Sequence, residues 1–132
     1  MENRKLGIKR DLEKEQHLIE SWNFKGMVDY AKDIIKGRWP EVEHIIARNP
    51  QASFYYARYV LKDRFLEAEM NIIKDICWIT PYASAIIKDR WPEAEPTLLD
   101  TQKFCYTWWS NYKFFLERIG RDIDIWDVEI WK

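Results

Sequence analysis

The sequence predicts an all-α fold of short α-helical hairpin repeats, stacked with a 26-residue period as a small solenoid-like domain. The stretch KGRWPEVE at 36–43 returns as KDRWPEAE at 88–95, and a weaker copy, KDRFLEAE, lies at 62–69. Arg38, Arg64 and Arg90 follow one another at this constant period. Self-similarity at a fixed period is typical of repeat arrays. We therefore predict one domain over 1–132, with an N-terminal cap at 1–22, three repeats at 23–100, and a C-terminal cap and tail at 101–132.

Residues 1–22 are mostly charged and predict a polar helix. The run Gln16–Ile19 resembles Glu43–Ile46, with Gln16 aligned to Glu43, so this helix imitates the second half of a repeat. Repeat arrays need such end units, because a terminal repeat has one face in water.

Each repeat is predicted to begin with a helix capped by a polar side chain. Asn23, Asn49, Asp75 and Thr101 follow one another at the same period, and all four residue types can accept a hydrogen bond from a helix first turn. A Tyr-Ala pair follows seven residues after each of the first three caps, on the apolar face. Gly37 is the expected left-handed stop of the first copy. Asp63 and Asp89 would take that role in the other copies.

The second helix of each repeat is predicted to open at Pro40 or Pro92, with Leu66 replacing the proline in the middle copy. Trp39, Phe65 and Trp91 precede these starts and are expected to be wedges in the core. Pro81 and Pro96 fall inside predicted helices and remove backbone donors. Helices near these two prolines should start late or bend.

The fourth unit departs from the pattern. Thr101 is expected to cap its helix, Trp108 and Trp109 stand where a strict period would place Tyr-Ala, and Gly120 should end the helix. The tail at 122–131 begins with strict apolar alternation and then slips to a helical spacing. Periodicity leaves strand and helix open there, and we favour a short helix.

Composition limits the classes of function. The formal net charge is −1, which argues against a nucleic-acid binder because such proteins are usually basic. No run is long and apolar enough for a membrane span, and no signal peptide is recognisable. Cys77 and Cys105 lack CxxC spacing and are interpreted as reduced thiols of a cytoplasmic protein.

No catalytic or metal-binding constellation is recognisable. The two histidines, His17 and His44, have no metal-ligand spacing around them, and there is no glycine-rich phosphate loop. We therefore expect no metal and no cofactor, and an enzyme is unsupported.

Aromatic and cationic side chains are the candidates for binding. The Arg38, Arg64 and Arg90 series is interpreted first as structural, each paired with a glutamate, and alternatively as a basic stripe for an anionic ligand or partner. Exposed rings are typical anchors of protein interfaces. We expect binding mainly in the third and fourth units and the tail. The ring candidates are Tyr55, Tyr59, Tyr106, Trp108, Trp109 and Trp126.

The pattern YAxxIIKxRWPExE resembles a family of short tandem two-helix repeats in tailed-bacteriophage proteins, over residues 23–103. The resemblance implies a phage protein in a bacterial cytoplasm that acts on, or inhibits, a host or defence protein. It carries no general activity. Three hypotheses stay open: a non-catalytic protein-interaction module, which we favour, a protein that binds or sequesters a small nucleotide-like anion, and an unrecognised enzyme. A homo-oligomer is compatible with each.

Overall fold

The fold is all-α, as the repeat pattern predicts. The computed structural model describes residues 10–101 and 106–121, and every regular element within them is helical. Two compact units are distinguished, residues 1–71 and 72–132, with the boundary inside one helix. No helix in the described residues is long and apolar enough to cross a membrane. The tail at 122–131, whose conformation the sequence leaves open, lies outside the described residues.

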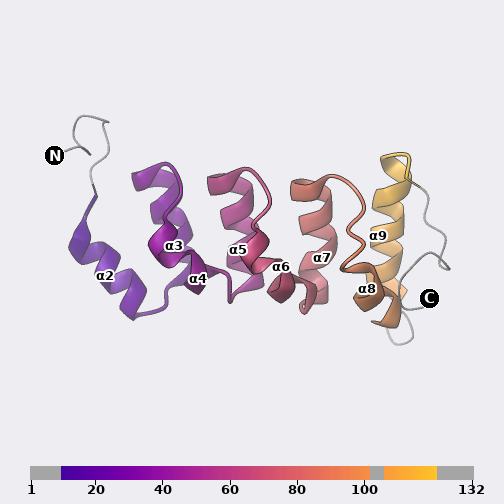
Figure 1. The fold of residues 1–132 in the computed structure, drawn as a ribbon, viewed down its shortest axis with the longest axis horizontal. Helices are drawn as coiled ribbons and strands as arrows, with labels where there is room; N and C mark the ends of the chain where they lie inside the picture. The colour runs from indigo at the N-terminus through magenta and orange to yellow at the C-terminus, as the bar shows by residue number, and fades with distance from the viewer. Residues whose placement is uncertain (1–9, 102–105, 122–132) are drawn as a thin grey trace. The chain divides into compact units, whose positions relative to one another are not determined.

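Each repeat consists of a longer helical column, made of an α-helix and the π-helix that continues it, and a shorter helix that returns along it. The columns are α3–η1, α5–η2 and α7–η3, and the returning helices are α4, α6 and α8. Within the first unit, α3 and α5 pack side by side (Figure 1). Within the second unit, α9 packs against both α7 and α8. In chain order the elements are α2 (Leu12–Glu20), α3 (Phe24–Tyr30), η1 (Ala31–Ile35), α4 (Pro40–Ile46), α5 (Pro50–Tyr56), η2 (Ala57–Leu61), α6 (Leu66–Ile73), α7 (Ile76–Tyr82), η3 (Ala83–Ile87), α8 (Glu95–Thr101) and α9 (Tyr106–Arg118).

Three of the four predicted caps are confirmed. The side chains of Asn23, Asn49 and Asp75 accept hydrogen bonds from the backbone N–H groups of Gly26, Ala52 and Cys77. The fourth is wrong, because Thr101 is the last residue of α8 rather than the cap of the next helix.

Each repeat column changes from α-helix to π-helix directly after its tyrosine. The wider turn ends at a lysine with left-handed backbone, namely Lys36 (φ 60°), Lys62 (φ 56°) or Lys88 (φ 64°). The prediction that Gly37, Asp63 and Asp89 make the left-handed stop is therefore wrong by one residue. The change also occurs after α3, which has no proline, and after α5, whose only proline is its first residue, Pro50, so Pro81 inside α7 is not its cause.

The returning helices begin as predicted in two of three repeats, since α4 starts at Pro40 and α6 at Leu66. The third start is wrong: α8 begins at Glu95, three residues later than Pro92. Pro96 explains the delay, because it has no N–H to donate to the carbonyl of Pro92 in a helical turn. A tighter bond from the Glu95 N–H to that carbonyl (3.2 Å) closes a turn instead.

The aromatic wedges are confirmed. Trp39, Phe65 and Trp91 are 1%, 3% and 1% exposed. Each contacts a tyrosine that ends the preceding α-helical segment, with ring centroids 5.1 Å apart for Tyr30 and Trp39, and 4.9 Å apart for Tyr82 and Trp91. Aromatic pairs at such distances add to the stabilisation that burial provides.

Two of these tyrosines, Tyr30 and Tyr56, bond the preceding segment of the chain through their hydroxyl groups. Tyr56 donates to Oε2 of Glu43 (2.7 Å) and accepts from the backbone N–H of Trp39 (2.8 Å). Glu43 also receives both arms of Arg38. A buried carboxylate is stable only when it is paired and hydrogen-bonded, so this cluster allows the core to hold a charge.

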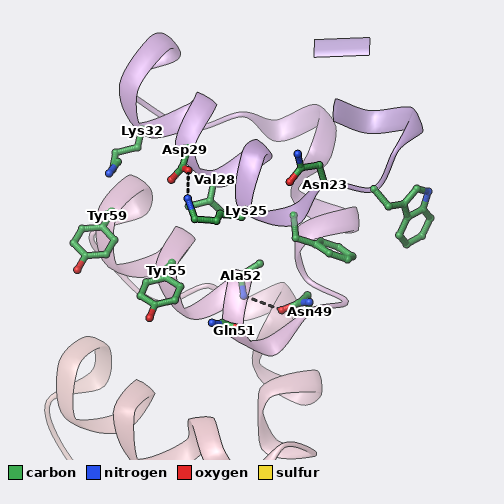
Figure 2. A pocket seen from close by; sticks show the side chains of 12 residues that line it. Asn23, Lys25, Val28, Asp29, Lys32, Asn49, Gln51, Ala52, Tyr55 and Tyr59 are labelled. Carbon is green, nitrogen blue, oxygen red and sulfur yellow. Dashed lines mark hydrogen bonds and ion pairs between the residues drawn. The ribbon is translucent and has the colours of Figure 1, made fainter. Parts of the chain in front are cut away.

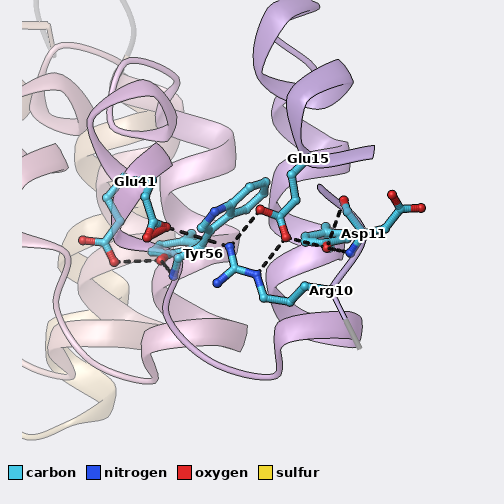
Figure 3. A network of polar contacts seen from close by, with 8 residues as sticks. Arg10, Asp11, Glu15, Glu41 and Tyr56 are labelled. Atoms are coloured by element: carbon cyan, nitrogen blue, oxygen red, sulfur yellow. Dashed lines mark hydrogen bonds and ion pairs between the residues drawn. The ribbon is translucent and has the colours of Figure 1, made fainter. Parts of the chain in front are cut away.

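An equivalent cluster corrects the alignment of the N-terminal helix. Tyr30 donates to Glu15 (2.6 Å) and accepts from the Asp11 N–H, while Arg10 pairs with Glu15 (Figure 3). Glu15, rather than Gln16, thus occupies the position of Glu43, and the predicted alignment is wrong by one residue.

The fourth repeat follows a different spacing from the one predicted. Tyr112 accepts from the Trp91 N–H (2.8 Å) and donates to Glu95 (2.6 Å), as Tyr56 does for Trp39 and Glu43. Tyr112 follows the wedge that it bonds, Trp91, by 21 positions. Tyr56 follows Trp39 by 17 positions. The prediction that Trp108 and Trp109 take the Tyr-Ala positions is therefore wrong. Gly120 (φ 76°) follows the end of α9 as predicted.

Candidate functional site

A groove of about 570 Å³ opens on the first unit, between the turn after α2 and the columns of α3 and α5 (Figure 2). Its size falls in the usual range of ligand pockets. Aromatic rings and polar side chains line it together. The lining residues are Trp22, Asn23, Phe24, Lys25, Val28, Asp29, Lys32, Asn49, Gln51, Ala52, Tyr55 and Tyr59.

Tyr55 and Tyr59 form the aromatic wall of the groove. Their rings are stacked nearly parallel, with centroids 6.1 Å apart and an interplanar angle of 9°. They are 37% and 45% exposed, whereas Tyr56 on the same column is fully buried. The sequence singled out both as binding candidates, and the structure brings both to the same groove.

The repeat does not require these rings. At the positions one period before and one period after Tyr55 the chain has Asp29 and Pro81. The positions that hold the fold, by contrast, keep their residue type from copy to copy. The wall is therefore a local feature of the second copy, and its exposed area is available for recognition.

A longer turn places Trp22 at the other side of the groove. The N–H of Asn49 bonds the carbonyl of Ile46, three residues earlier, whereas the N–H of Asn23 bonds that of Leu18, five residues earlier. The first turn thus contains two additional residues. Trp22 is one of the residues in this turn, has a left-handed backbone (φ 54°) and is 46% exposed. Such a conformation is unfavourable for a bulky residue, and this turn holds Trp22 in it.

Cations lie against the exposed rings. Lys32 Nζ is 5.7 Å from the ring centroid of Tyr59, and the Arg58 guanidinium is 5.5 Å from the same centroid on its own column. The Arg48 guanidinium is 5.2 Å from the centroid of Trp22. Lys25 pairs with Asp29 at 2.8 Å in the lining of the groove. The site therefore combines flat apolar surfaces with positive charge.

Each arginine of the series pairs with a glutamate, as its first interpretation predicts. Arg38, Arg64 and Arg90 each make a two-armed contact with the glutamate five residues later in the same unit. The hydrogen bonds from Arg38 outweigh burial and, together with Tyr56, hold the pKa of Glu43 below its ordinary value. A smaller cavity of about 290 Å³ lies between Arg38 and Arg64, but Glu43 and Glu67 in its lining offset the positive charge.

Two of the remaining ring candidates, Trp108 and Trp109, lie on α9. Trp109 is 3% exposed and packs on Tyr112, so it has no surface for a partner. Trp108 is half-buried on α9. Tyr106 is the first residue of α9, and Trp126 lies outside the described residues. Phe114, on the same helix, is 62% exposed and was not among the candidates.

Among the residues that line the groove, only Tyr55 and Tyr59 were predicted from the sequence as binding residues, and Trp22, Phe24 and Lys32 are among those that were missed. The signal for Trp22 was present in the spacing, since Leu18 and Asn23 are five residues apart where Ile46 and Asn49 are three apart. Recognising it required the alignment of Glu15 with Glu43. Lys32 gave no signal of its own, because an exposed lysine is ordinary.

Within residues 10–101 and 106–121, no three His, Cys, Asp or Glu side chains are grouped so that they could hold a metal ion. No family model, curated protein or solved structure matches the chain.

Proposed function

We propose that the chain is a non-catalytic interaction module that binds a protein partner through the groove of the first unit. The observation that carries the proposal is the convergence of Trp22, Tyr55 and Tyr59 on one groove. These exposed rings are not needed by the repeat. Tyrosine, tryptophan and arginine are enriched at protein interfaces, and all three types meet here.

The resemblance of the repeat to those of tailed-bacteriophage proteins supports a class of partner. On that basis we propose that the module binds and modulates a host or defence protein in the cytoplasm of a bacterium. A helical-repeat surface suits this task, because repeat proteins commonly present recognition residues on one face.

The test is affinity capture from host lysate with three forms of the full chain. The parent is compared with a Tyr55→Ala/Tyr59→Ala variant and with Phe114→Ala, a control that removes an exposed ring from the second unit. A partner captured by the parent and the control but not by the groove variant supports the proposal. Equal capture by all three forms, with equal unfolding free energies, contradicts it.

A second function is favoured by one specific observation. The groove volume suits a small molecule, and the parallel rings of Tyr55 and Tyr59 beside Lys32 would suit a planar anion such as a nucleotide. Calorimetry with a set of nucleoside monophosphates distinguishes this alternative. Saturable binding that Tyr59→Ala abolishes would favour it over a protein partner.

A further inference from the structure

The groove carries a local positive charge on a chain that is nearly neutral. Four cations line it or lie on its rings, namely Lys25, Lys32, Arg48 and Arg58. Two carboxylates accompany them: Asp29 at 2.8 Å from Lys25, and Asp33 at 3.8 Å from Lys32. The difference, four cations minus two carboxylates, is an excess of two positive charges. An occupant should therefore be acidic as well as apolar.

The chain itself contains a segment with the complementary chemistry. Residues 122–131 read DIDIWDVEIW, with four carboxylates and no lysine or arginine. Two indole rings and four aliphatic side chains alternate with the charges. The segment lies outside the described residues, and its sequence alone shows this combination of charge and apolar surface.

We propose that the groove of one copy binds the acidic, tryptophan-containing segment 122–131 of a second copy. The proposal rests on the groove being a binding surface, as in the proposed function, and adds a named occupant. The indole of Trp126 or Trp131 provides a flat surface for the exposed rings of Tyr55 and Tyr59. The carboxylates of the segment meet the lysines and arginines around the groove, which favours this occupant over a neutral peptide.

Such a contact joins two different surfaces of the chain, so the association of copies has a direction. Each copy offers one groove and one segment, so association is head to tail and extends to rings or chains of copies. Because exposed charges contribute, association should weaken as salt rises above about 0.1 M, where the screening length is about 10 Å.

The experiment mixes two variants of the full chain that each lack one half of the contact. The groove variant is Tyr55→Ala/Tyr59→Ala, and the segment variant is Trp126→Ala/Trp131→Ala. Sedimentation velocity is recorded for the parent, for each variant alone, and for their equimolar mixture, over protein concentrations up to about 1 mM, the dissociation constant of a weak complex. Circular dichroism and urea melts verify that each variant is folded.

The proposal expects a parent that associates with rising concentration, two variants that remain monomeric alone, and a mixture that forms one heterodimer and nothing larger. Addition of a peptide with the sequence of residues 122–132 should dissociate the parent assembly. A monomeric parent over the whole range, or variants that associate like the parent, would overturn it. So would a mixture that remains monomeric.

The outcomes also separate this inference from the proposed function. If the parent is monomeric but the groove variant loses a captured protein, the groove binds a different partner and only the self-association is wrong. If a single-stranded oligonucleotide, and not the peptide, binds the groove, both proposals fail, because stacked rings with cations also suit nucleic acid.

Discussion

The hydroxyl group of Tyr56 donates a 2.7 Å hydrogen bond to the carboxylate of Glu43 in the preceding repeat segment. Both groups are buried, and the same hydroxyl accepts the backbone N–H of Trp39. One side chain thus satisfies two buried polar groups of the neighbouring segment while its ring packs on Phe65 of its own. Tyr112 makes the same two bonds, to Glu95 and to the Trp91 N–H.

Tyr56→Phe should lower the free energy of unfolding by about 1–3 kcal/mol, because it leaves a buried carboxylate and a buried N–H without this partner. Tyr59→Phe is the matched control, since its ring is 45% exposed, and should be neutral within about 0.5 kcal/mol. Urea unfolding of both variants measures the difference. Equal stability of Tyr56→Phe and the parent would contradict the role of the hydroxyl.

Glu43→Gln should destabilise the chain at pH 7 and have less effect in acid. Arg38, and then Tyr56, hold the pKa of Glu43 below its ordinary value despite burial. The carboxylate therefore contributes stability above about pH 4.5, and this contribution is lost as pH falls through the depressed pKa. Unfolding free energies of parent and variant, measured from pH 7 to pH 3, should converge. A difference that stays constant with pH would show that the charge is not responsible.

Trp91→Ala should lower the free energy of unfolding by about 3–5 kcal/mol, the usual range for removing a buried large ring. The side chain is 1% exposed and its ring contacts that of Tyr82. Trp22→Ala removes the same ring from a site that is 46% exposed and should cost far less. Chemical denaturation that gives equal losses for the two tryptophans would show that Trp91 is not a core wedge.

Lys62→Gly should raise the free energy of unfolding by up to about 1 kcal/mol. Lys62 has φ 56°, and left-handed backbone costs a residue with a Cβ atom about 1–2 kcal/mol, part of which the greater freedom of glycine in the unfolded chain offsets. Gly37→Ala is the control: Gly37 does not have left-handed backbone, and a Cβ there meets no atom within 4 Å. Thermal melts should show Gly37→Ala unharmed. A large loss there would restore Gly37 as the left-handed stop.

The repeating parts of the fold were predictable because local chemistry determines them. Caps such as Asn49 and wedges such as Trp39 follow from residue type and period. The left-handed lysines were not predictable, since they follow from the π-helical end of each column, for which Lys36 gives no signal in the sequence. The predicted spacings at both ends of the array failed because additional residues shift the period there, and contacts such as that of Tyr112 with Glu95 reveal the shift.

The candidate site was predictable only in part. Tyr55 and Tyr59 stood out because one face of a short helix cannot bury both of them and Tyr56 as well. Trp22 and Lys32 join them only through the packing of α3 against α5 and through the longer first turn. Among the tryptophans that favoured the fourth repeat as a binding surface, Trp109 is buried and Trp108 is half-buried.

The most direct test of the groove as the binding surface is site-specific photo-crosslinking in host lysate. A photoreactive phenylalanine analogue replaces Tyr59 in one form of the chain and Phe114 in another, both at exposed ring positions. We expect a discrete crosslinked product from position 59, containing a partner protein or a second copy of the chain, and none from position 114. A product from position 114 alone, or the same products from both positions, would contradict the assignment of binding to the groove of the first unit.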